Sequence, residues 1–325
     1  VKVVVVSMFE NGEVTGDRPG EFQMWVEGRN LDKEYDFPLG EYTLRMDDEG
    51  VLGICIGGGI ANATASIMAL GLDSRFDLRD AYWLVAGIAG ADPADMSLGS
   101  AAWAKHVVDG DLVYEIDARE IPQEWPYGLI PLGGKEPADE PEDIYTSWTL
   151  NTIHFELNDH LAQWAFEQTK SLKLEDGEEI AEFRKQFSDF PNAMRPPFVT
   201  MGETLSASTY WHGTHFNQWA NDWIKLYAGE NANFMTSNME DSGTLTALTR
   251  LNREEIIDIN RVMVLRTASN FTIAPTNQKT TWSVTAPYPD EGLPAIKSAF
   301  TVGNAVVENI VNNWSIYQTT IPGEK

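Results

Sequence analysis

The sequence predicts an α/β protein built on one central sheet whose strands are parallel or mixed in direction. Short β-branched and apolar runs alternate along the chain with segments of helical composition, which is the order expected of an α/β domain. No repeat, low-complexity tract or change of composition divides the 325 residues. We therefore expect a single domain over residues 1–325, with insertions in its loops.

The first part of the chain contains the clearest strand, turn and helix in succession. Val3–Ser7 is a β-branched run, typical of a central strand that is buried on both faces. An acidic, glycine-rich loop follows over Glu10–Gly20. Val51–Ile56 is a second apolar run that ends at Gly57–Gly59. Ile60–Leu70 then has apolar residues at helical spacing, so we expect a helix there.

Three more strands and one long excursion come next. Strands are expected at Tyr82–Ala86, Ser100–Val107 and Leu112–Ile116, the first of them ending in a turn at Gly87–Gly90. The segment at about residues 121–145 is rich in proline and acidic residues. Proline disrupts both helices and central strands, so this segment is predicted to be a surface insertion.

The remainder of the chain alternates longer helical segments with two strands. Pro197–Met201 and Arg261–Thr267 have the composition of strands. Helices are expected at Thr149–Leu172, Gly177–Phe187, His212–Tyr227, Asp241–Leu251 and Gly292–Trp314.

Composition excludes several classes of protein. The chain has 49 acidic and 23 basic residues, a formal net charge of −26, which argues against a nucleic-acid groove and against docking to an anionic membrane surface. Its single cysteine, Cys55, excludes an internal disulfide framework and a cysteine-rich zinc site. The longest apolar run, Ala81–Ala91, is far shorter than the roughly 20 residues of a membrane span, so no membrane insertion is expected.

The start of the chain bears on where the protein acts. It begins VKVVVV, with neither an initiating methionine nor a basic-then-apolar leader. We interpret the apolar start as the first strand and the missing methionine as a sign that a leader or tag was removed. The protein would then be periplasmic or exported if a leader was removed, and cytoplasmic otherwise.

Candidate site residues follow the strands, because ligands of α/β sheets bind beyond the carboxyl ends of the strands. The sequence has five such polar or glycine-rich places. They are Ser7–Glu10, Gly57–Gly59, Gly87–Gly90, Ser237–Asp241 and Ser269–Asn270.

Each of these features also has a purely structural explanation. Gly57–Gly59 can cradle an anion at a helix start or simply form a tight turn. His212 and His215 are three residues apart on an expected helix, but without a third ligand nearby we expect no metal. Glu240 stands where a helix begins, so it can bind a ligand or merely cap that helix.

Taken together, the motifs of this chain resemble those of the nucleoside phosphorylase superfamily, in particular its divergent branch, the purine nucleoside permeases. The matching segments are GGGIANATAS (57–66), LVAGIAGADP (84–93), LGSAAWA (98–104), TMGETLSASTYWHG (200–213), SNMEDSG (237–243) and VLRTASNF (264–271). The resemblance implies a three-layer α/β/α sandwich around a mixed, distorted sheet, and a homo-oligomer.

The resemblance also implies a role for each matching residue. Glu240 would bind the ribose hydroxyls, with Met239 packed under the sugar, while Tyr210 would face the base and Asn270, usually Asp, would contact its five-membered ring. Glu10 or Glu13 would lie near the acid that polarises water in hydrolytic members. The remaining expected substrate-binding residues are Phe9, Gly58, Gly59, Gly87, Ile88, Gly202, Glu203 and Thr204, with the last three beside the base.

The implied activity is cleavage of the N-glycosidic bond of a purine nucleoside (inosine, guanosine or adenosine) without a cofactor. Such cleavage develops positive charge on the sugar, which a buried carboxylate stabilises. Phosphate as nucleophile requires clustered positive charge, which the sequence does not offer: Ile88 replaces the usual Ser, and Arg18 stands beside Asp17. We therefore expect hydrolysis. The alternatives are a phosphate-dependent phosphorylase and a non-catalytic nucleoside-binding protein that assists uptake.

Overall fold

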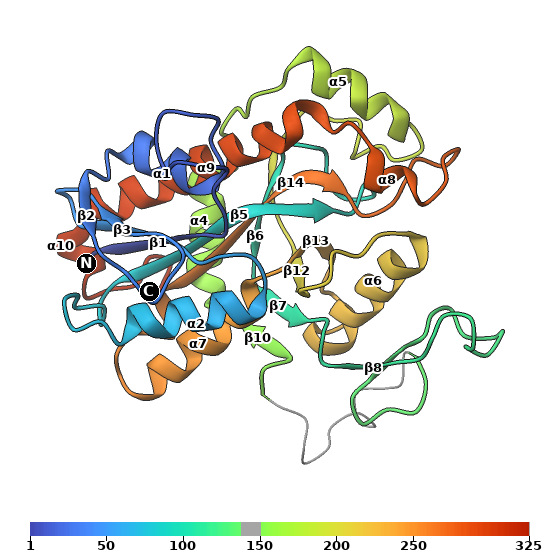
Figure 1. The fold of residues 1–325 in the computed structure, drawn as a ribbon, viewed down its shortest axis with the longest axis horizontal. Coiled ribbons are helices and arrows are strands. Elements are labelled where there is room, and N and C mark those ends of the chain that lie inside the picture. The colour runs from blue at the N-terminus through green and yellow to red at the C-terminus, as the bar shows by residue number, and fades with distance from the viewer. Residues whose placement is uncertain (138–150, 325) are drawn as a thin grey trace.

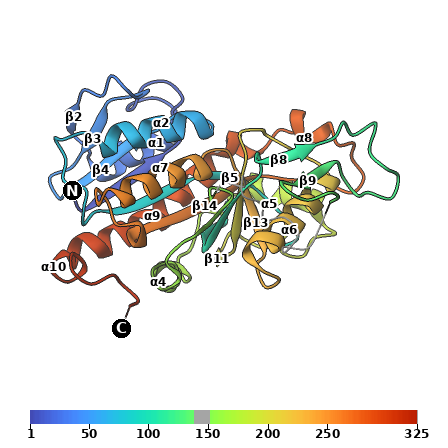
Figure 2. The same ribbon diagram turned by 90° about the horizontal axis from the view of Figure 1, so that it is seen from below.

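A computed structural model describes residues 1–137 and 151–324 of the chain. Within these residues one twelve-stranded mixed sheet forms the centre of the protein, with helices on both faces (Figures 1 and 2). The strands of this sheet are β1 (Val3–Ser7), β2 (Lys33–Tyr35), β3 (Leu44–Met46), β4 (Val51–Cys55), β5 (Tyr82–Ala91), β6 (Ala101–Ala104), β7 (His106–Asp109), β10 (His154–Glu156), β11 (Val199–Met201), β12 (Glu203–Ser206), β13 (Phe234–Asn238) and β14 (Val262–Phe271). A separate two-stranded sheet pairs β8 (Val113–Glu115) with β9 (Leu129–Pro131).

The helices form the outer layers of the predicted three-layer α/β/α sandwich. They are α1 (Glu21–Arg29), α2 (Ile60–Gly71), α4 (Asp159–Thr169), α5 (Glu178–Arg184), α6 (Thr214–Ala228), α7 (Asp241–Arg253), α8 (Trp282–Thr285), α9 (Leu293–Asn312) and α10 (Trp314–Tyr317). Short 3₁₀ turns cover Lys185–Phe187, Ile259–Arg261 and Pro289–Gly292. Helices α2 and α7 lie against one face of the sheet, and α1, α4 and α9 lie against the other. Figure 1 shows α2 and α7 below the strands and α1 and α9 above them.

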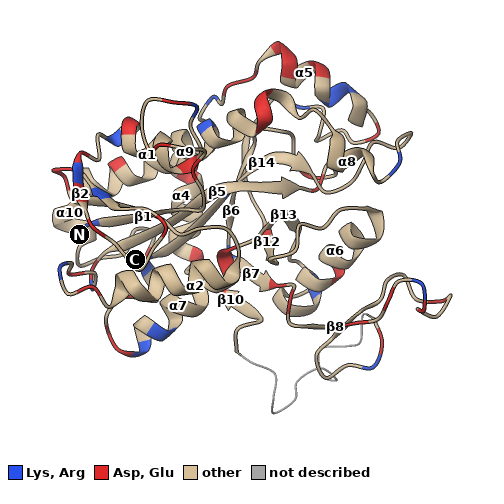
Figure 3. Cartoon of the chain, in the orientation of Figure 1, with Lys and Arg blue, Asp and Glu red and all other residues tan. Residues whose placement is uncertain are grey.

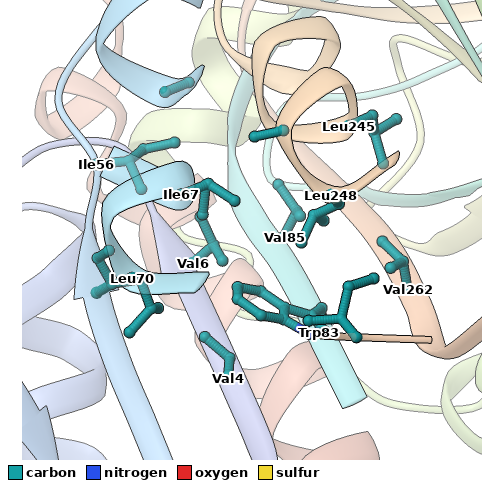
Figure 4. Packing of buried hydrophobic residues seen from close by; sticks show 14 of the residues in the cluster. Val4, Val6, Ile56, Ile67, Leu70, Trp83, Val85, Leu245, Leu248 and Val262 are labelled. Atoms are coloured by element: carbon teal, nitrogen blue, oxygen red, sulfur yellow. The ribbon is translucent and has the colours of Figure 1, made fainter. Parts of the chain in front are cut away.

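The alternation of side chains along β1 explains the two layers. Val4 and Val6 belong to the core under α2 and α7, whereas Val3 and Val5 belong to the core under α1 and α9. Successive side chains of a strand point to opposite faces, so a run of valines is buried on both sides of a central strand. Figure 4 shows the first of these cores, where Ile67 and Leu248 pack on the sheet.

The site lies where two strands, β1 and β13, pair with different parts of the same edge of β5. Strand β14 pairs with β5 over its whole length, from Trp83 to Ala91, so β1 and β13 must share the opposite edge of β5. β1 occupies that edge as far as Val85, and β13 joins it antiparallel at Gly90. Between Val85 and Gly90 neither β1 nor β13 pairs with this edge of β5, so side chains can occupy the space beside it.

Most expected elements are present, but several differ, among them the expected strand Ser100–Val107, which is divided into β6 and β7. Residues Gly87–Gly90 were expected to form a turn but continue β5, because β14 pairs with them along their length and β13 pairs with Gly90. The expected helix Thr149–Leu172 is in its described part a strand, β10, followed by α4, which begins where the Asn158 side chain accepts hydrogen bonds from the backbone N–H groups of His160 and Leu161. Helix α1 was not expected at all.

The acidic charge is distributed over the molecule. Figure 3 shows acidic residues on loops and helix ends on both sides of the sheet. The expected insertion at residues 121–145 contains β9, and its residues 138–145 lie outside the described part. Among residues 1–137 and 151–324, no helix is both long enough and apolar enough to cross a bilayer.

Candidate functional site

A cavity of about 200 Å³ lies where β1 and β13 part from β5. We call it the inner cavity. It is lined by Met8, Phe9, Glu21, Ile88, Ala89, Gly90, Tyr210, Ser237, Asn238, Met239, Glu240, Arg266, Ser269 and Asn270. These residues come from β5 and β14, from the ends of β1 and β13, and from the starts of α1 and α7, while Tyr210 comes from the loop between β12 and α6. The inner cavity therefore joins segments that are up to 262 residues apart in the sequence, Met8 and Asn270.

Glu240 is placed by the turn between β13 and α7. The Asn238 side-chain oxygen accepts hydrogen bonds from the backbone N–H groups of Glu240 (3.1 Å) and Asp241 (2.9 Å), so Asn238 supplies the helix cap. Glu240 is thereby free of that duty, and its carboxylate accepts from the N–H groups of Met239 (3.2 Å) and Gly59 (3.4 Å). Burial raises the pKa of Glu240, an effect opposed by Arg266.

Arg266 is the cation of the site. Its guanidinium donates to the Asp241 carboxylate through Nε (3.1 Å) and Nη2, to Glu240 through Nη2 (3.4 Å) and to the Ile88 carbonyl through Nη1 (3.1 Å). Arg266 and Asp241 are fully buried, at 1% and 0% exposure. Such a two-bond pair holds the guanidinium in one orientation, so most of its charge is already committed to protein carboxylates.

Glu21 is the second carboxylate of the inner cavity. It begins α1, and its two oxygens accept hydrogen bonds from the backbone N–H groups of Met8 and Ile88, each 2.7 Å long. It therefore ties the end of β1 to β5 where the two strands part. Burial, with a smaller contribution from Glu240, raises the pKa of Glu21 to about 7 against the lowering effect of Arg266. Near neutral pH this carboxyl group can accept or release a proton.

Gly87 makes room for these groups. A Cβ at this position would lie 2.5 Å from the Met8 sulfur, 2.7 Å from Glu21 Oε1 and 2.9 Å from Arg266 Nη1. Only glycine lets the strand approach the ion pairs so closely. Gly87 was expected to bind substrate, and the structure gives it this packing role beside the inner cavity.

The opposite end of the inner cavity is formed by Asn270, Ser269 and Tyr210. The Asn270 amide donates to the Tyr210 hydroxyl oxygen (2.8 Å) and accepts from the Ser269 hydroxyl (2.9 Å). The Tyr210 ring is 56% exposed, and burial of its hydroxyl raises the pKa of the phenol. Because Asn270 donates to it, the Tyr210 oxygen keeps its own proton for another acceptor.

Of the residues expected from the sequence, six line the inner cavity: Phe9, Ile88, Tyr210, Met239, Glu240 and Asn270. Gly59 lies next to it, in contact with Glu240. Gly58 is not among the residues that line the inner cavity, and a Cβ at this position would meet no atom within 4 Å. Ile88 contributes its backbone, since its N–H and carbonyl bind Glu21 and Arg266.

The other expected residues lie outside the inner cavity. The Glu10 carboxylate accepts from the backbone N–H groups of Asn11, Gly20 and Gln23, which fixes the loop before α1. Glu13 is exposed. Glu203 accepts from the N–H groups of Lys105 (3.2 Å) and His106 (2.6 Å).

Thr204 and Gly202 support the site from outside. The Thr204 hydroxyl accepts from the Asn238 amide (2.8 Å), which orients the side chain that caps α7. A Cβ on Gly202 would collide with the Met235 side chain at 2.4 Å. Both residues of this segment therefore shape the sheet behind the inner cavity.

The structure offers no arrangement for a metal among the residues it describes, in which no three His, Cys, Asp or Glu groups gather as ligands. The two acids at the start of α7 pair with Arg266 instead. Burial lowers the pKa of His212 to about 4, as befits a histidine packed as a neutral ring.

Comparison with known proteins identifies the family of the chain. Residues 1–322 match the family model described as purine nucleoside permease. The chain belongs to the purine nucleoside permease family. A probable purine nucleoside permease of Schizosaccharomyces pombe is 33% identical over 267 residues, covering 80% of this chain and 76% of that protein. A purine nucleoside permease of Candida albicans is 31% identical over 278 residues, covering 84% of this chain but only 66% of its own length.

Solved structures of similar fold include nucleosidases. The MTA/SAH nucleosidase of Streptococcus pneumoniae, solved with 8-aminoadenine, has a TM-score of 0.54 at 12% identity and covers 95% of this chain and 99% of its own. Futalosine hydrolase of Helicobacter pylori has a TM-score of 0.55 at 12% identity and covers 95% and 97%. At 12% identity, this likeness shows that the chain has the nucleoside phosphorylase-like fold, and it says nothing about activity.

Proposed function

We propose that this protein hydrolyses the N-glycosidic bond of purine nucleosides to free base and ribose. The observation that carries the proposal is the charge of the inner cavity. Three buried carboxyl groups, from Glu21, Glu240 and Asp241, surround one guanidinium, that of Arg266. Asp241 offsets the charge of Arg266, so Glu240 and Glu21 in their ionised forms leave a surplus of negative charge. Buried negative charge favours a cationic, oxocarbenium-like sugar in the transition state.

At the sugar end, Glu240 accepts hydrogen bonds from the ribose hydroxyls, with Met239 packed against the ring. Its carboxylate is already oriented by Arg266 and by the N–H groups of Met239 and Gly59, so little reorganisation is needed when charge develops. Glu21, with its pKa near 7, removes a proton from the attacking water.

At the base end, the departing purine is received by Tyr210 and Asn270. As the C1′–N9 bond breaks, its electron pair moves into the purine, and the Tyr210 hydroxyl donates its proton to the imidazole ring. The water oxygen bonds to C1′ while its proton passes to Glu21. Solvent then reprotonates Tyr210 and deprotonates Glu21, so that nucleoside and water are converted into base and ribose.

Water is favoured over phosphate as the nucleophile by the same charges. Of the described residues that line the inner cavity, Arg266 alone is cationic, and Asp241 binds it through two nitrogen atoms. A phosphate dianion would face Glu21 and Glu240 without a free positive partner, which costs free energy.

The test measures release of base from inosine, guanosine and adenosine by chromatography, in buffer with and without phosphate. The proposal expects base release at the same rate in both buffers and free ribose as the second product. Release that depends on phosphate and yields a sugar phosphate would contradict it.

A second candidate function is nucleoside binding without cleavage, in support of uptake. One observation favours it: the relatives are named permeases. The resemblance also implies that an acid, usually Asp, stands at the position of Asn270 in cleaving members. Calorimetry distinguishes the two functions, because this candidate expects tight binding of a nucleoside that is recovered intact after prolonged incubation.

A further inference from the structure

A larger cavity of about 700 Å³ adjoins the inner cavity. We call it the outer cavity. Four residues line both: Ile88, Tyr210, Ser269 and Asn270. The sugar-side groups Glu21, Glu240 and Arg266 line the inner cavity only. The outer cavity therefore opens from the end of the site at which Asn270 and Tyr210 would hold the base.

We propose that the outer cavity binds an uncharged aryl or alkyl substituent on the base, so that the protein accepts purine nucleosides enlarged at the heterocycle. This inference rests on the proposed function, since it takes Asn270 and Tyr210 as the base end. Pockets for drug-sized ligands measure about 300–1,000 Å³, so the outer cavity is large enough for an additional ring.

The walls of the outer cavity suit an apolar group. Ala286, Pro287 and Tyr288 are among the residues that line it. Tyr288 is held in place because its hydroxyl accepts from the Phe271 N–H (3.2 Å) and its ring packs 5.0 Å from Phe183 and 6.0 Å from Trp282. A fixed aromatic wall offers stacking area without an entropic cost of ordering.

The charges around the outer cavity disfavour an anionic substituent. Glu179, Asp290 and Glu291 line it, against the single guanidinium of Arg18. Arg18 is committed to the same acids, donating to the Asp290 carbonyl (2.7 Å) and carboxylate (2.9 Å), and lying 3.4 Å from Glu291. A carboxylate on the substituent would meet this acidic rim and be repelled.

The experiment compares parent and enlarged nucleosides in two series, which carry the substituent at different positions of the base. The pairs are adenosine with N6-benzyladenosine and guanosine with N2-benzylguanosine, each with its 4-carboxybenzyl analogue. The readout is kcat/KM for base release, or Kd by calorimetry for a compound that is bound but not cleaved. The benzyl compound of at least one series is expected to match or exceed its parent, and the carboxybenzyl analogue to be at least tenfold poorer.

Two variants locate the effect. Ala286→Trp fills the outer cavity and is expected to lower the benzyl-to-parent ratio at least tenfold. Thr285→Trp adds the same bulk to the neighbouring exposed residue, which does not line the cavity, and is expected to leave that ratio unchanged.

The outcomes separate this inference from the proposed function. If a parent nucleoside is cleaved or bound but both benzyl compounds are more than tenfold poorer, the inference is wrong and the proposed function stands. An unchanged ratio in Ala286→Trp also overturns the inference. If no parent is cleaved or bound, the proposed function fails and the inference fails with it.

Discussion

The two ends of the inner cavity differ in chemistry and in exposure. At the sugar end, Glu240 is 7% exposed and belongs to a buried network of carboxylates around Arg266. At the base end, Tyr210 is 56% exposed and is joined to Asn270 by a neutral hydrogen bond. The end proposed for the sugar is a buried network of charged groups, whereas the end proposed for the base is open and its side chains have no formal charge.

This difference suits the two halves of a nucleoside. All ribonucleosides share the same sugar, and the positive charge that develops on it needs fixed, buried anions. Bases vary in their hydrogen-bonding groups and size, and an amide with a phenol can both donate and accept. The sugar end would therefore set the reaction, and the base end the range of substrates.

The largest expected effect follows from breaking the sugar end. Arg266→Met leaves Asp241, Glu240 and Glu21 without their shared cation, which should lower the free energy of unfolding by about 3–5 kcal/mol. Urea denaturation measures it. Lys297→Met is the control, because it breaks an exposed pair with Glu175 and should cost no more than about 1 kcal/mol. Equal losses of free energy in the two variants would show that the buried network stabilises the fold no more than an exposed ion pair does.

Glu240→Gln tests the carboxylate that would stabilise the sugar cation. Removing its charge should lower kcat about 100- to 1,000-fold, the range seen when one preorganised stabilising group is lost. The loss should be smaller with a 2′,3′-dideoxynucleoside, which lacks the hydroxyls that Glu240 would bind. A variant that cleaves inosine at the wild-type rate would exclude this role for Glu240.

Glu21→Gln tests the glutamate that we propose as the general base, the group that takes a proton from the attacking water. In the wild type, kcat should rise as the pH increases through about 7, because the ionised form of Glu21 is the active one. The variant should lose this limb and about 100-fold of kcat at pH 8. Glu10→Gln is the matched control: it changes the glutamate that was expected from the sequence, and it should keep both the limb and the rate. The reverse pattern would restore the role to Glu10.

The same glutamate should affect folding stability with the opposite sign. The pKa of Glu21 is about 7 in the folded protein and 4.5 in the reference state, so between these pH values the folded state binds the proton and the unfolded chain has released it. The contribution of Glu21 to the free energy of unfolding therefore decreases as pH rises from about 4.5 to about 7. Urea denaturation at several pH values should show a shallower decrease in Glu21→Gln.

The smallest expected effect concerns the base end. Tyr210→Phe should lower kcat for inosine only about tenfold, less than the usual loss of a general acid, because water reaches this exposed end and can protonate the base instead. A nitrophenyl riboside, whose leaving group needs no proton, should be cleaved at an unchanged rate. An equal loss with both substrates would show that Tyr210 only packs against the ligand.

The sequence predicted the polar site residues that stand near the ends of apolar strand runs. It missed Arg266, which lies within such a run, and Glu21, which begins a helix that was not expected. Glu240 and Asn270 were found because each stands near the end of an apolar strand run. Arg266 was missed because it lies within such a run, and a buried cation there has no signal in the residue pattern. Its partner Asp241 was noticed only as the last residue of the polar segment Ser237–Asp241.

Glu21 was missed because its helix was missed. In α1, EFQMWVEGR, apolar and polar residues are not separated at helical spacing, since Phe22, Gln23 and Trp25 are all buried. The pattern therefore gave no helix and no helix start. The fold class depended on longer signals, such as the valines of β1 and the helical spacing of α2, and was predicted correctly. The continuation of β5 through Gly87–Gly90 depends on pairing with β13 and β14, which no local pattern reveals.

One measurement tests most directly whether this buried, acidic cavity directs water to the sugar. The protein is incubated with inosine in phosphate-free buffer prepared in H₂¹⁸O, and the products are analysed by mass spectrometry immediately after quenching. The account predicts hypoxanthine and ribose carrying one ¹⁸O at C1′, in excess of the label that free ribose exchanges on its own. Intact inosine after binding has been verified by calorimetry would contradict it.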